Sequence, residues 1–279
     1  MVVKIVTDSL SDITSDLAEE LGVTIVPLTV FFGHESYLDR VTITTDEFYR
    51  RLIEGDVWPT TTQPPPADFI DVYNKLADET DEILVITLSN KISGTYQSAL
   101  NAKSMIEKKC RIEVIDSLTV AMGLGLIVIT AAKAAQAGTN LDKLVELVRL
   151  SMARSHFICY FDTLKYLAKG GRIGKASSFL GSVLSFKPIL TVQEGEMAPL
   201  TRVRSLAAGM DYLYNFVARF SHVDELAVEH TTTPNIADNL VEHLNSIFSK
   251  ERIYRSTVSP VLGTYGGPGA VAVTVFGDK

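Results

Sequence analysis

The sequence has few cysteines, no excess of positive charge and no hydrophobic run long enough to cross a membrane. Cys110 and Cys159 are too few for a disulfide framework, and their spacing does not fit a zinc ribbon. Lys and Arg number 26 against 33 Asp and Glu, which argues against nucleic acid or an anionic membrane surface as the main partner. Asp8 interrupts the first apolar run too early for a signal peptide, and residues 117–132 fall short of the ~18 apolar residues of a membrane span. We therefore expect a soluble, cytoplasmic protein with reduced thiols.

The familiar catalytic and cofactor motifs are also missing. No Gly-x-x-x-x-Gly-Lys-Ser/Thr phosphate loop, His-Glu-x-x-His zinc motif or Gly-x-Ser-x-Gly nucleophile elbow occurs. The pair Gly123-x-Gly125 has Val128 where a dinucleotide fingerprint needs its third glycine. We therefore expect a binding crevice without catalytic residues, metal or cofactor.

The first half of the chain alternates apolar strands with helices, and 46% of all residues are hydrophobic, enough for a sizeable core. This alternation predicts an α/β domain, residues 1–153, with a mostly parallel sheet flanked by helices. We expect strands at residues 2–7, 23–32, 82–88 and 111–117, and helices from Thr14 or Ser15 to Gly22, from Thr45, from Thr95 to about Glu107, within residues 117–132, and at 141–153.

The second half, residues 154–279, has a different pattern that predicts a second α/β domain with a mixed sheet and helices. A Glu194-Gly195-Glu196 turn joins two strands in a predicted hairpin. Further strands are expected at residues 157–161, 226–230, 253–258 and 270–276, and helices at 164–167, 206–220 and 235–248.

A short loop, Ser93-Gly94-Thr95, joins the predicted strand at residues 82–88 to the next helix. A helix N-terminus offers free N–H groups and a partial positive charge, and therefore favours an anion. Gly94 permits close approach of a ligand to the backbone, while Ser93 and Thr95 add hydroxyl donors. The alternative is that Ser93 or Thr95 simply caps the helix.

A second group of hydroxyls, Thr60-Thr61-Thr62, lies in a loop rich in threonine and proline that we predict for residues 59–66. Considered alone, this segment is a stiff connector, because its prolines are excluded from a helix interior or a central strand. Loops at the carboxyl ends of parallel strands converge on the ligand crevice of an open α/β sheet. If this loop reaches that crevice, its hydroxyls and those near Ser93 surround one anionic group.

Five segments, each weak alone, form an ordered set across the whole chain. They are Val6-Thr7-Asp8-Ser9, Thr61-Thr62-Gln63-Pro64, Ile92-Ser93-Gly94-Thr95-Tyr96-Gln97-Ser98-Ala99, residues 164–174 and Gly267-Pro268-Gly269. The set resembles the DegV family of bacterial fatty-acid-binding proteins. The resemblance implies two α/β domains with a long-chain fatty acid, such as palmitate, buried between them. It also implies that some members hand the acid to a separate fatty acid kinase subunit, which makes acyl phosphate for phospholipid synthesis.

The resemblance also implies the residues of the site. By motif position, Thr62 and Ser93 hydrogen-bond the carboxylate, with Thr61 and the Gly94 N–H as helpers. Where the family has Thr-His-Thr-Gly-Pro-Gly, this chain has Thr264-Tyr265-Gly266-Gly267-Pro268-Gly269, so the Tyr265 hydroxyl takes the place of histidine as donor. The family's Thr-Ser-Gln-Pro-Ser has become Thr-Thr-Gln-Pro-Pro at residues 61–65, which keeps the hydroxyl at Thr62.

Three further hypotheses concern the tail, the partner and the reaction. Residues 179–186 are a candidate tunnel wall, with ordinary core packing as the alternative. Arg172, Arg202 and Arg204 are candidates for a cationic face toward a kinase or its nucleotide, with solvated surface charge as the alternative.

The competing function is an enzyme that acts on an acyl or phosphorylated substrate with Ser93 as nucleophile. A nucleophilic serine needs an adjacent base, and only His156 and His230 are candidates, although no spacing supports either. A lipid sensor is a third possibility, which the sequence does not separate from a carrier.

Overall fold

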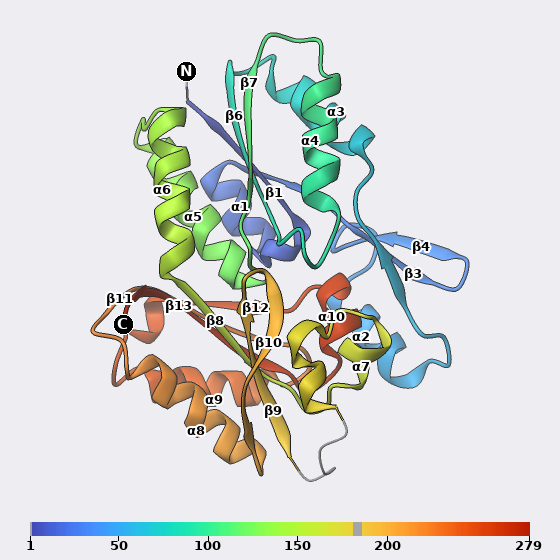
Figure 1. Ribbon diagram of the computed structural model, residues 1–279, viewed down its shortest axis with the longest axis vertical. Coiled ribbons are helices and arrows are strands. Elements are labelled where there is room, and N and C mark those ends of the chain that lie inside the picture. The colour runs from blue at the N-terminus through green and yellow to red at the C-terminus, as the bar shows by residue number, and fades with distance from the viewer. Residues whose placement is uncertain (1, 181–185) are drawn as a thin grey trace.

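The first half of the chain builds a parallel sheet in the computed structural model, which describes residues 2–180 and 186–279. Helices cover both faces of this sheet, with α5 (Met122–Gln136) and α6 (Leu141–Arg154) on one side and α3 (Pro66–Leu76) and α4 (Thr95–Met105) on the other (Figure 1). Ile5 and Leu84 belong to the same buried cluster as residues of α5 and α6, while Val6 and Val85 belong to that of α3 and α4. Burial on both faces explains why these strands are continuous apolar runs. The strands, in spatial order, are β2 (Val23–Val26), β1 (Lys4–Asp8), β6 (Glu82–Thr87) and β7 (Arg111–Asp116).

The second half builds a six-stranded mixed sheet, in which only β11 and β12 pair in parallel. Helices α8 and α9 cover its outer face, at the bottom of Figure 1. The expected α/β class, with a parallel first sheet and a mixed second sheet, is confirmed. The strands, in spatial order, are β10 (Glu196–Val203), β9 (Lys187–Gln193), β8 (Ser155–Tyr160), β13 (Val271–Asp278), β11 (His222–His230) and β12 (Ile253–Thr257).

Helix α5 lies between the two sheets and contacts both β1 and β8. Its residues are buried almost all round, so it is apolar on every side, as expected for the run at residues 117–132. Among the described residues, no helix is long and apolar enough to cross a membrane. The α-helices are α1 (Ser15–Leu21), α2 (Thr45–Glu54), α3 (Pro66–Leu76), α4 (Thr95–Met105), α5 (Met122–Gln136), α6 (Leu141–Arg154), α7 (Lys165–Lys169), α8 (Leu206–Val217), α9 (Pro234–Leu244) and α10 (Pro260–Gly266); the 3₁₀ helices are η1 (Ser9–Ser11), η2 (Gly174–Phe179) and η3 (Lys250–Arg252).

The prediction of a loop over residues 59–66 is wrong, because residues 60–62 form a strand of a small antiparallel sheet. Its strands are β4 (Glu35–Leu38), β3 (Thr29–Phe32) and β5 (Thr60–Thr62), so the three threonines form an edge strand. Pro66 is the first residue of α3, the one helical position where a missing N–H costs nothing. The pairing of Thr61 with Val30 joins distant segments, and local sequence patterns do not reveal such contacts.

The entry to α5 is strained. Ala121 precedes the helix at φ 55° and ψ −148°, a region that is essentially restricted to glycine. Leu118, three residues earlier, also has a positive φ. The strained loop is held by its surroundings, because Met122 N donates a hydrogen bond to the buried Glu229 carboxyl across 3.1 Å.

We predict that Ala121→Gly stabilises the protein by about 1 kcal/mol, because relief of about 1–3 kcal/mol of strain exceeds the roughly 0.5–1 kcal/mol entropic cost of glycine. Urea denaturation measures the difference. Ala134→Gly within the same helix is the control and is expected to cost about 1 kcal/mol. Equal destabilisation by both substitutions contradicts the assignment of strain to Ala121.

Candidate functional site

A pocket of about 200 Å³ lies where the carboxyl ends of β1, β2 and β6 meet. Leu10 follows β1, Leu28 follows β2, and Ser93 follows β6, so the parallel strands deliver three loops to one place. Strand β5 adds threonine hydroxyls to the same pocket. Its lining is Leu10, Leu28, Thr61, Thr62, Gln63, Ile92, Ser93, Arg172, Val261, Leu262 and Tyr265.

Aspartates at the ends of β1 and β7 fix the loops that form the pocket. The buried Asp8 carboxylate accepts hydrogen bonds from Leu10 N at 3.0 Å and Leu88 N at 2.7 Å, which ties together the loops after β1 and β6. Burial raises the pKa of Asp8 to about 7, against the lowering effect of these two bonds. Asp116 likewise accepts hydrogen bonds from Asn90 N and Leu118 N, each at 3.1 Å, and so ties together the loops after β6 and β7. Asp8-Ser9 at the end of β1 and Asp116-Ser117 at the end of β7 are thus the same dipeptide in the same place, and in both the aspartate anchors loops.

The start of α4 rules out the capping alternative. Gly94 is the N-cap residue and makes no side-chain capping bond, while the Ser93 and Thr95 hydroxyls lie 2.9 Å apart and bond to each other. Ser93 lines the pocket, whereas Thr95 is fully buried and, like Gly94, is not part of the lining. Gly94 was expected to let a ligand approach the backbone. In the structure it makes room for the Gln63 side-chain amide, which a Cβ at this position would overlap.

Tyr265 and Arg172 complete the polar wall. The Tyr265 hydroxyl lies 2.5 Å from Thr61 Oγ1, so these two sequence candidates meet directly. The Arg172 guanidinium lies 5.2 Å from the centre of the Tyr265 ring and donates to the Ile92 and Gly170 carbonyls. We expected Arg172 only on a partner-facing surface. It is exposed and also lines the pocket, which places a cation at its rim.

An apolar chamber of about 70 Å³ adjoins the polar pocket, and Leu262 and Tyr265 line both. Small residues leave it open, including Ala121, Cys159, Ala270 and Ala272. Apolar cavities of this kind stay free of water. The chamber is lined by Val120, Ala121, Phe157, Cys159, Phe161, Leu167, Met197, Thr231, Val258, Leu262, Tyr265, Gly266, Ala270 and Ala272.

The structure bears on two expectations from the sequence, the state of the Cys159 thiol and the candidate tunnel wall at residues 179–186. Burial raises the pKa of the Cys159 thiol well above its usual value, so the thiol stays neutral and unreactive. Of the stretch proposed as a wall, residues 181–185 lie outside the described residues. Phe179, Leu180 and Phe186 are described and do not line the chamber; Phe179 lies under the Arg202 guanidinium at 4.1 Å.

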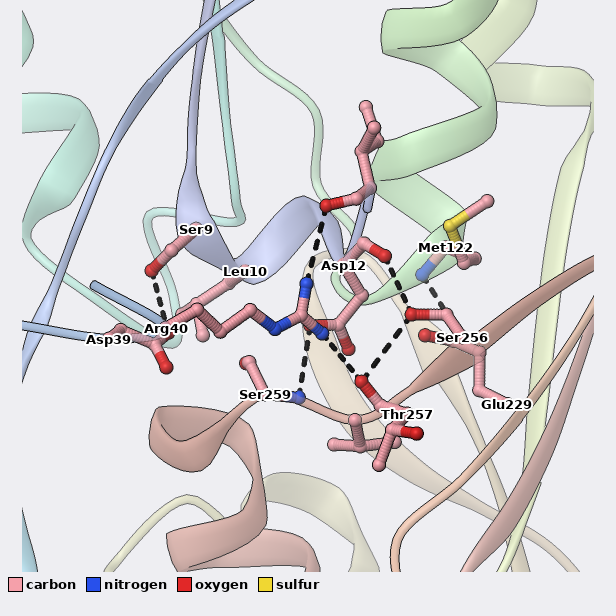
Figure 2. A network of polar contacts seen from close by, with 12 residues as sticks. Ser9, Leu10, Asp12, Asp39, Arg40, Met122, Glu229, Ser256, Thr257 and Ser259 are labelled. Carbon is pink, nitrogen blue, oxygen red and sulfur yellow. Dashed lines mark hydrogen bonds and ion pairs between the residues drawn. The ribbon is translucent and has the colours of Figure 1, made fainter. Parts of the chain in front are cut away.

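Helix α10, which carries Tyr265, is held in place by a buried polar network (Figure 2). Asp12 accepts hydrogen bonds from Arg40 Nη2 at 2.8 Å and Ser259 N at 3.1 Å on one carboxylate oxygen. Its backbone carbonyl accepts a bond from Ser256 Oγ at 2.7 Å, and Arg40 also donates to the Thr257 carbonyl. The segment after η1 therefore fixes the residues that begin α10.

The network contains more carboxyl groups than cations. Burial, and then the charge of Asp12, raise the pKa of Glu229 well above its usual value, which favours the protonated carboxyl. Asp12 Oδ2 and Glu229 Oε1 have no other hydrogen-bond partner, and a proton on Glu229 satisfies both. Arg40 then neutralises Asp12, and the cluster carries little net charge.

The two histidines considered as bases for Ser93 lie elsewhere. His156 lies beside Phe220, 5.0 Å between ring centres, and His230 lines a separate small pocket with Asp238. Neither histidine lines the pocket that contains Ser93, so the nucleophile hypothesis loses both of its candidate bases. Within the described parts of the chain, no cluster of His, Cys, Asp and Glu fits a metal ion.

Comparison with known proteins agrees with this fold. A family model described as "Uncharacterised protein, DegV family" matches residues 2–278. The chain belongs to the DegV family. A DegV domain-containing protein of Caldanaerobacter subterraneus subsp. tengcongensis is 38% identical over 275 residues, which cover 97% of each chain.

Two solved DegV structures are close in shape to this chain. A Thermus thermophilus DegV family protein, described with its fatty acid binding, has a TM-score of 0.91 at 31% identity and covers 99% of this chain and 100% of its own. The Bacillus subtilis DegV, described as a fatty acid binding protein, has a TM-score of 0.90 at 27% identity, with 99% of each chain covered. The family resemblance of the sequence is thus confirmed.

We predict that the stability of the Glu229→Gln variant, relative to that of wild type, increases as pH rises. The folded pKa of Glu229 is raised, so below the unfolded pKa both states hold the proton, whereas above it only the folded state does. Wild-type stability therefore falls with rising pH by up to about 1.4 kcal/mol per unit from this group, and glutamine lacks that loss. Urea denaturation at pH 5 and pH 8 measures the difference.

The control for this prediction is Glu19→Gln on the exposed side of α1, which is expected to show no such change. A difference between Glu229→Gln and wild type that is equal at pH 5 and pH 8 contradicts the protonated state of Glu229.

Proposed function

We propose that this protein binds a long-chain fatty acid, with the carboxylate in the polar pocket and the tail in the apolar chamber between the units formed by residues 1–153 and 154–279. The observation that carries this proposal is that Leu262 and Tyr265 line both spaces, so a polar end continues into an apolar one. The fatty acid binding described for the Thermus thermophilus and Bacillus subtilis relatives supports it.

The headgroup is held by neutral donors. We assign Thr62 and Ser93 as the direct partners of the carboxylate, with Thr61, Tyr265, Thr95 and the Gly94 N–H in support. The Thr61–Tyr265 and Ser93–Thr95 hydroxyl pairs support this assignment, because each orients a hydroxyl at or beside the pocket. Hydrogen bonds to an ionised group are stronger than neutral ones, so such donors are sufficient without a fully buried cation.

The tail supplies most of the affinity. Each CH₂ that becomes buried contributes about 0.8 kcal/mol, so complete burial of a sixteen-carbon chain contributes roughly 10 kcal/mol before the costs of association. Such a chain is larger than the chamber of about 70 Å³, so the lining side chains have to move apart when the tail enters. The headgroup donors contribute less and determine which end of the ligand enters first. In this proposal the protein is a lipid carrier that catalyses no reaction itself, which agrees with the absence of His156 and His230 from the lining of the Ser93 pocket.

The carrier presents its ligand to a fatty acid kinase. Arg172 and Arg202 are exposed and flank η2: Arg172 precedes it in sequence, and Arg202 packs over Phe179 at its end. Arginine suits the phosphates of a nucleotide or an acyl phosphate. Arg172 also lines the pocket, which brings a cation near the proposed carboxylate.

We predict that Ser93→Ala and Thr62→Ala each weaken palmitate binding about 5- to 30-fold, from loss of one charge-assisted hydrogen bond worth about 1–2 kcal/mol. Displacement of a fluorescent fatty acid measures the affinity, and native mass spectrometry of protein purified from cells tests for a retained C16–C18 acid.

Thr60→Ala is the matched control, because Thr60 lies in the same strand but not in the pocket lining, and its affinity is expected to equal that of wild type. Unchanged binding in both Ser93→Ala and Thr62→Ala argues against this headgroup site. An empty protein that hydrolyses model esters through Ser93 instead favours the enzyme.

We predict that Arg202→Ala lowers the rate at which a fatty acid kinase phosphorylates the bound acid, without changing palmitate affinity. Arg172→Ala is expected to lower the rate and also weaken binding, because Arg172 lines the pocket. Rates are compared with all variants saturated with lipid, and Arg219→Ala, over Tyr212 and away from the pocket, serves as the control. Rates equal to that of wild type in both variants contradict the proposal that Arg172 and Arg202 face a kinase.

A further inference from the structure

A second, larger cleft of about 650 Å³ lies outside the proposed lipid site, between α6, β8 and the β9–β10 hairpin. It opens to solvent at Leu118 and Leu200, which are 41% and 40% exposed. Part of its lining is apolar, from Met152, Leu200 and Phe216, and part is cationic, from Arg149 and Lys279.

The cleft forms where β8 and β9 separate. These two strands pair only from Ile158 to Tyr160 on β8, opposite Ile189 to Thr191 on β9. Residues 155–157 of β8 and 192–193 of β9 continue without pairing to each other, and all of them line the cleft. The Thr191 hydroxyl donates to the Phe157 carbonyl across 2.7 Å and holds the end of the paired stretch.

Phe157 is the one residue that the outer cleft and the inner chamber share in their described linings. Side chains two residues apart on a strand share a face. Phe157 and Cys159 of β8, and Phe161 directly after β8, therefore follow one another along the chamber over about 13 Å. Phe161 lies near α10, since a Cβ at Gly266 would stand 4.0 Å from its ring. Phe157 lies near α5, since a Cβ at Gly123 would stand 3.5 Å from the Phe157 Cβ.

The order of sizes along β8 defines the ends of the chamber. The small Cys159, with Ala272 opposite it on β13, leaves the space open, while Phe161 stands on the headgroup side and Phe157 on the far side. Phe157 is 7% exposed and lines both spaces, so it lies between the chamber and the outer cleft.

We propose that Phe157 closes the tail end of the lipid chamber and thereby limits the length of the acyl chain that the protein binds. This inference rests on the proposed function. A chain too long for the chamber has to displace the Phe157 ring, and its end then enters the outer cleft, where Met152, Leu200 and Phe216 cover part of it. Shortening Phe157 joins the two spaces and removes the limit.

The test compares the affinities of wild type, Phe157→Ala and Phe157→Leu for palmitic acid and for a saturated twenty-two-carbon acid. Each added CH₂ that becomes buried raises affinity about fourfold. We expect the affinity ratio of the long acid to palmitic acid to rise at least tenfold in Phe157→Ala and less in Phe157→Leu. Phe157→Leu, a milder loss of volume, carries the test if the alanine variant does not fold.

Two further variants show whether the gain depends on the outer cleft. Phe161→Ala removes the same side chain from the same strand face but borders only the chamber, so its ratio is expected to change less than that of Phe157→Ala. Adding Leu200→Arg to Phe157→Ala places a charge in the cleft and is expected to reverse the gain.

The outcomes separate this inference from the proposed function. If wild type and every folded variant bind palmitic acid and the ratio stays at the wild-type value, the role of Phe157 is wrong and the lipid site stands. An equal rise in Phe161→Ala, or a gain that survives Leu200→Arg, overturns it as well. If wild type does not bind palmitic acid, the proposed function fails and this inference fails with it.

Discussion

The position of the candidate site depends on one buried carboxylate, Asp12, which joins the first half of the chain to the start of α10. Its contacts to Arg40, Ser256 and Ser259 are made inside the protein, where breaking a charge pair by removing one partner costs about 3–5 kcal/mol. The proton on Glu229 removes the excess negative charge that would otherwise oppose the contact. Because Tyr265 lies in α10, the contacts of Asp12 at the start of that helix help to position the Tyr265 hydroxyl in the pocket.

Polar and apolar functions are divided between the two halves of the molecule. Loops at the carboxyl ends of the parallel strands supply Ser93, and the small sheet beside them supplies Thr61 and Thr62. The mixed sheet supplies a floor of small side chains, Cys159 and Ala272 among them, below α5. Helix α10 borders both environments through Leu262 and Tyr265, and Tyr265 suits this position because it has an apolar ring and a polar hydroxyl.

The predicted site was partly visible in the sequence. The sequence suggests Ser93 as a candidate because a hydroxyl and a glycine between a strand and a helix form a local pattern, and parallel strands bring such loops to one edge. The importance of Thr61 and Thr62 depended on where their segment lies, and pairing of β5 with β3 decides that. Arg172 is a candidate for a partner-facing surface because arginine suits phosphate, and its contact with Tyr265 joins distant segments that no local pattern reveals.

The sequence by itself determined the alternation of strands and helices, the buried character of α5, the hairpin at Gly195 and the family of the chain, since these depend on residues close together in the chain or on ordered motifs. The tertiary structure decided what depends on distant contacts: the edge strand β5, the seating of α10 on Asp12, and the small side chains that leave a chamber open between the sheets. A cavity is the space that packing leaves unfilled, and no local pattern of residues encodes it.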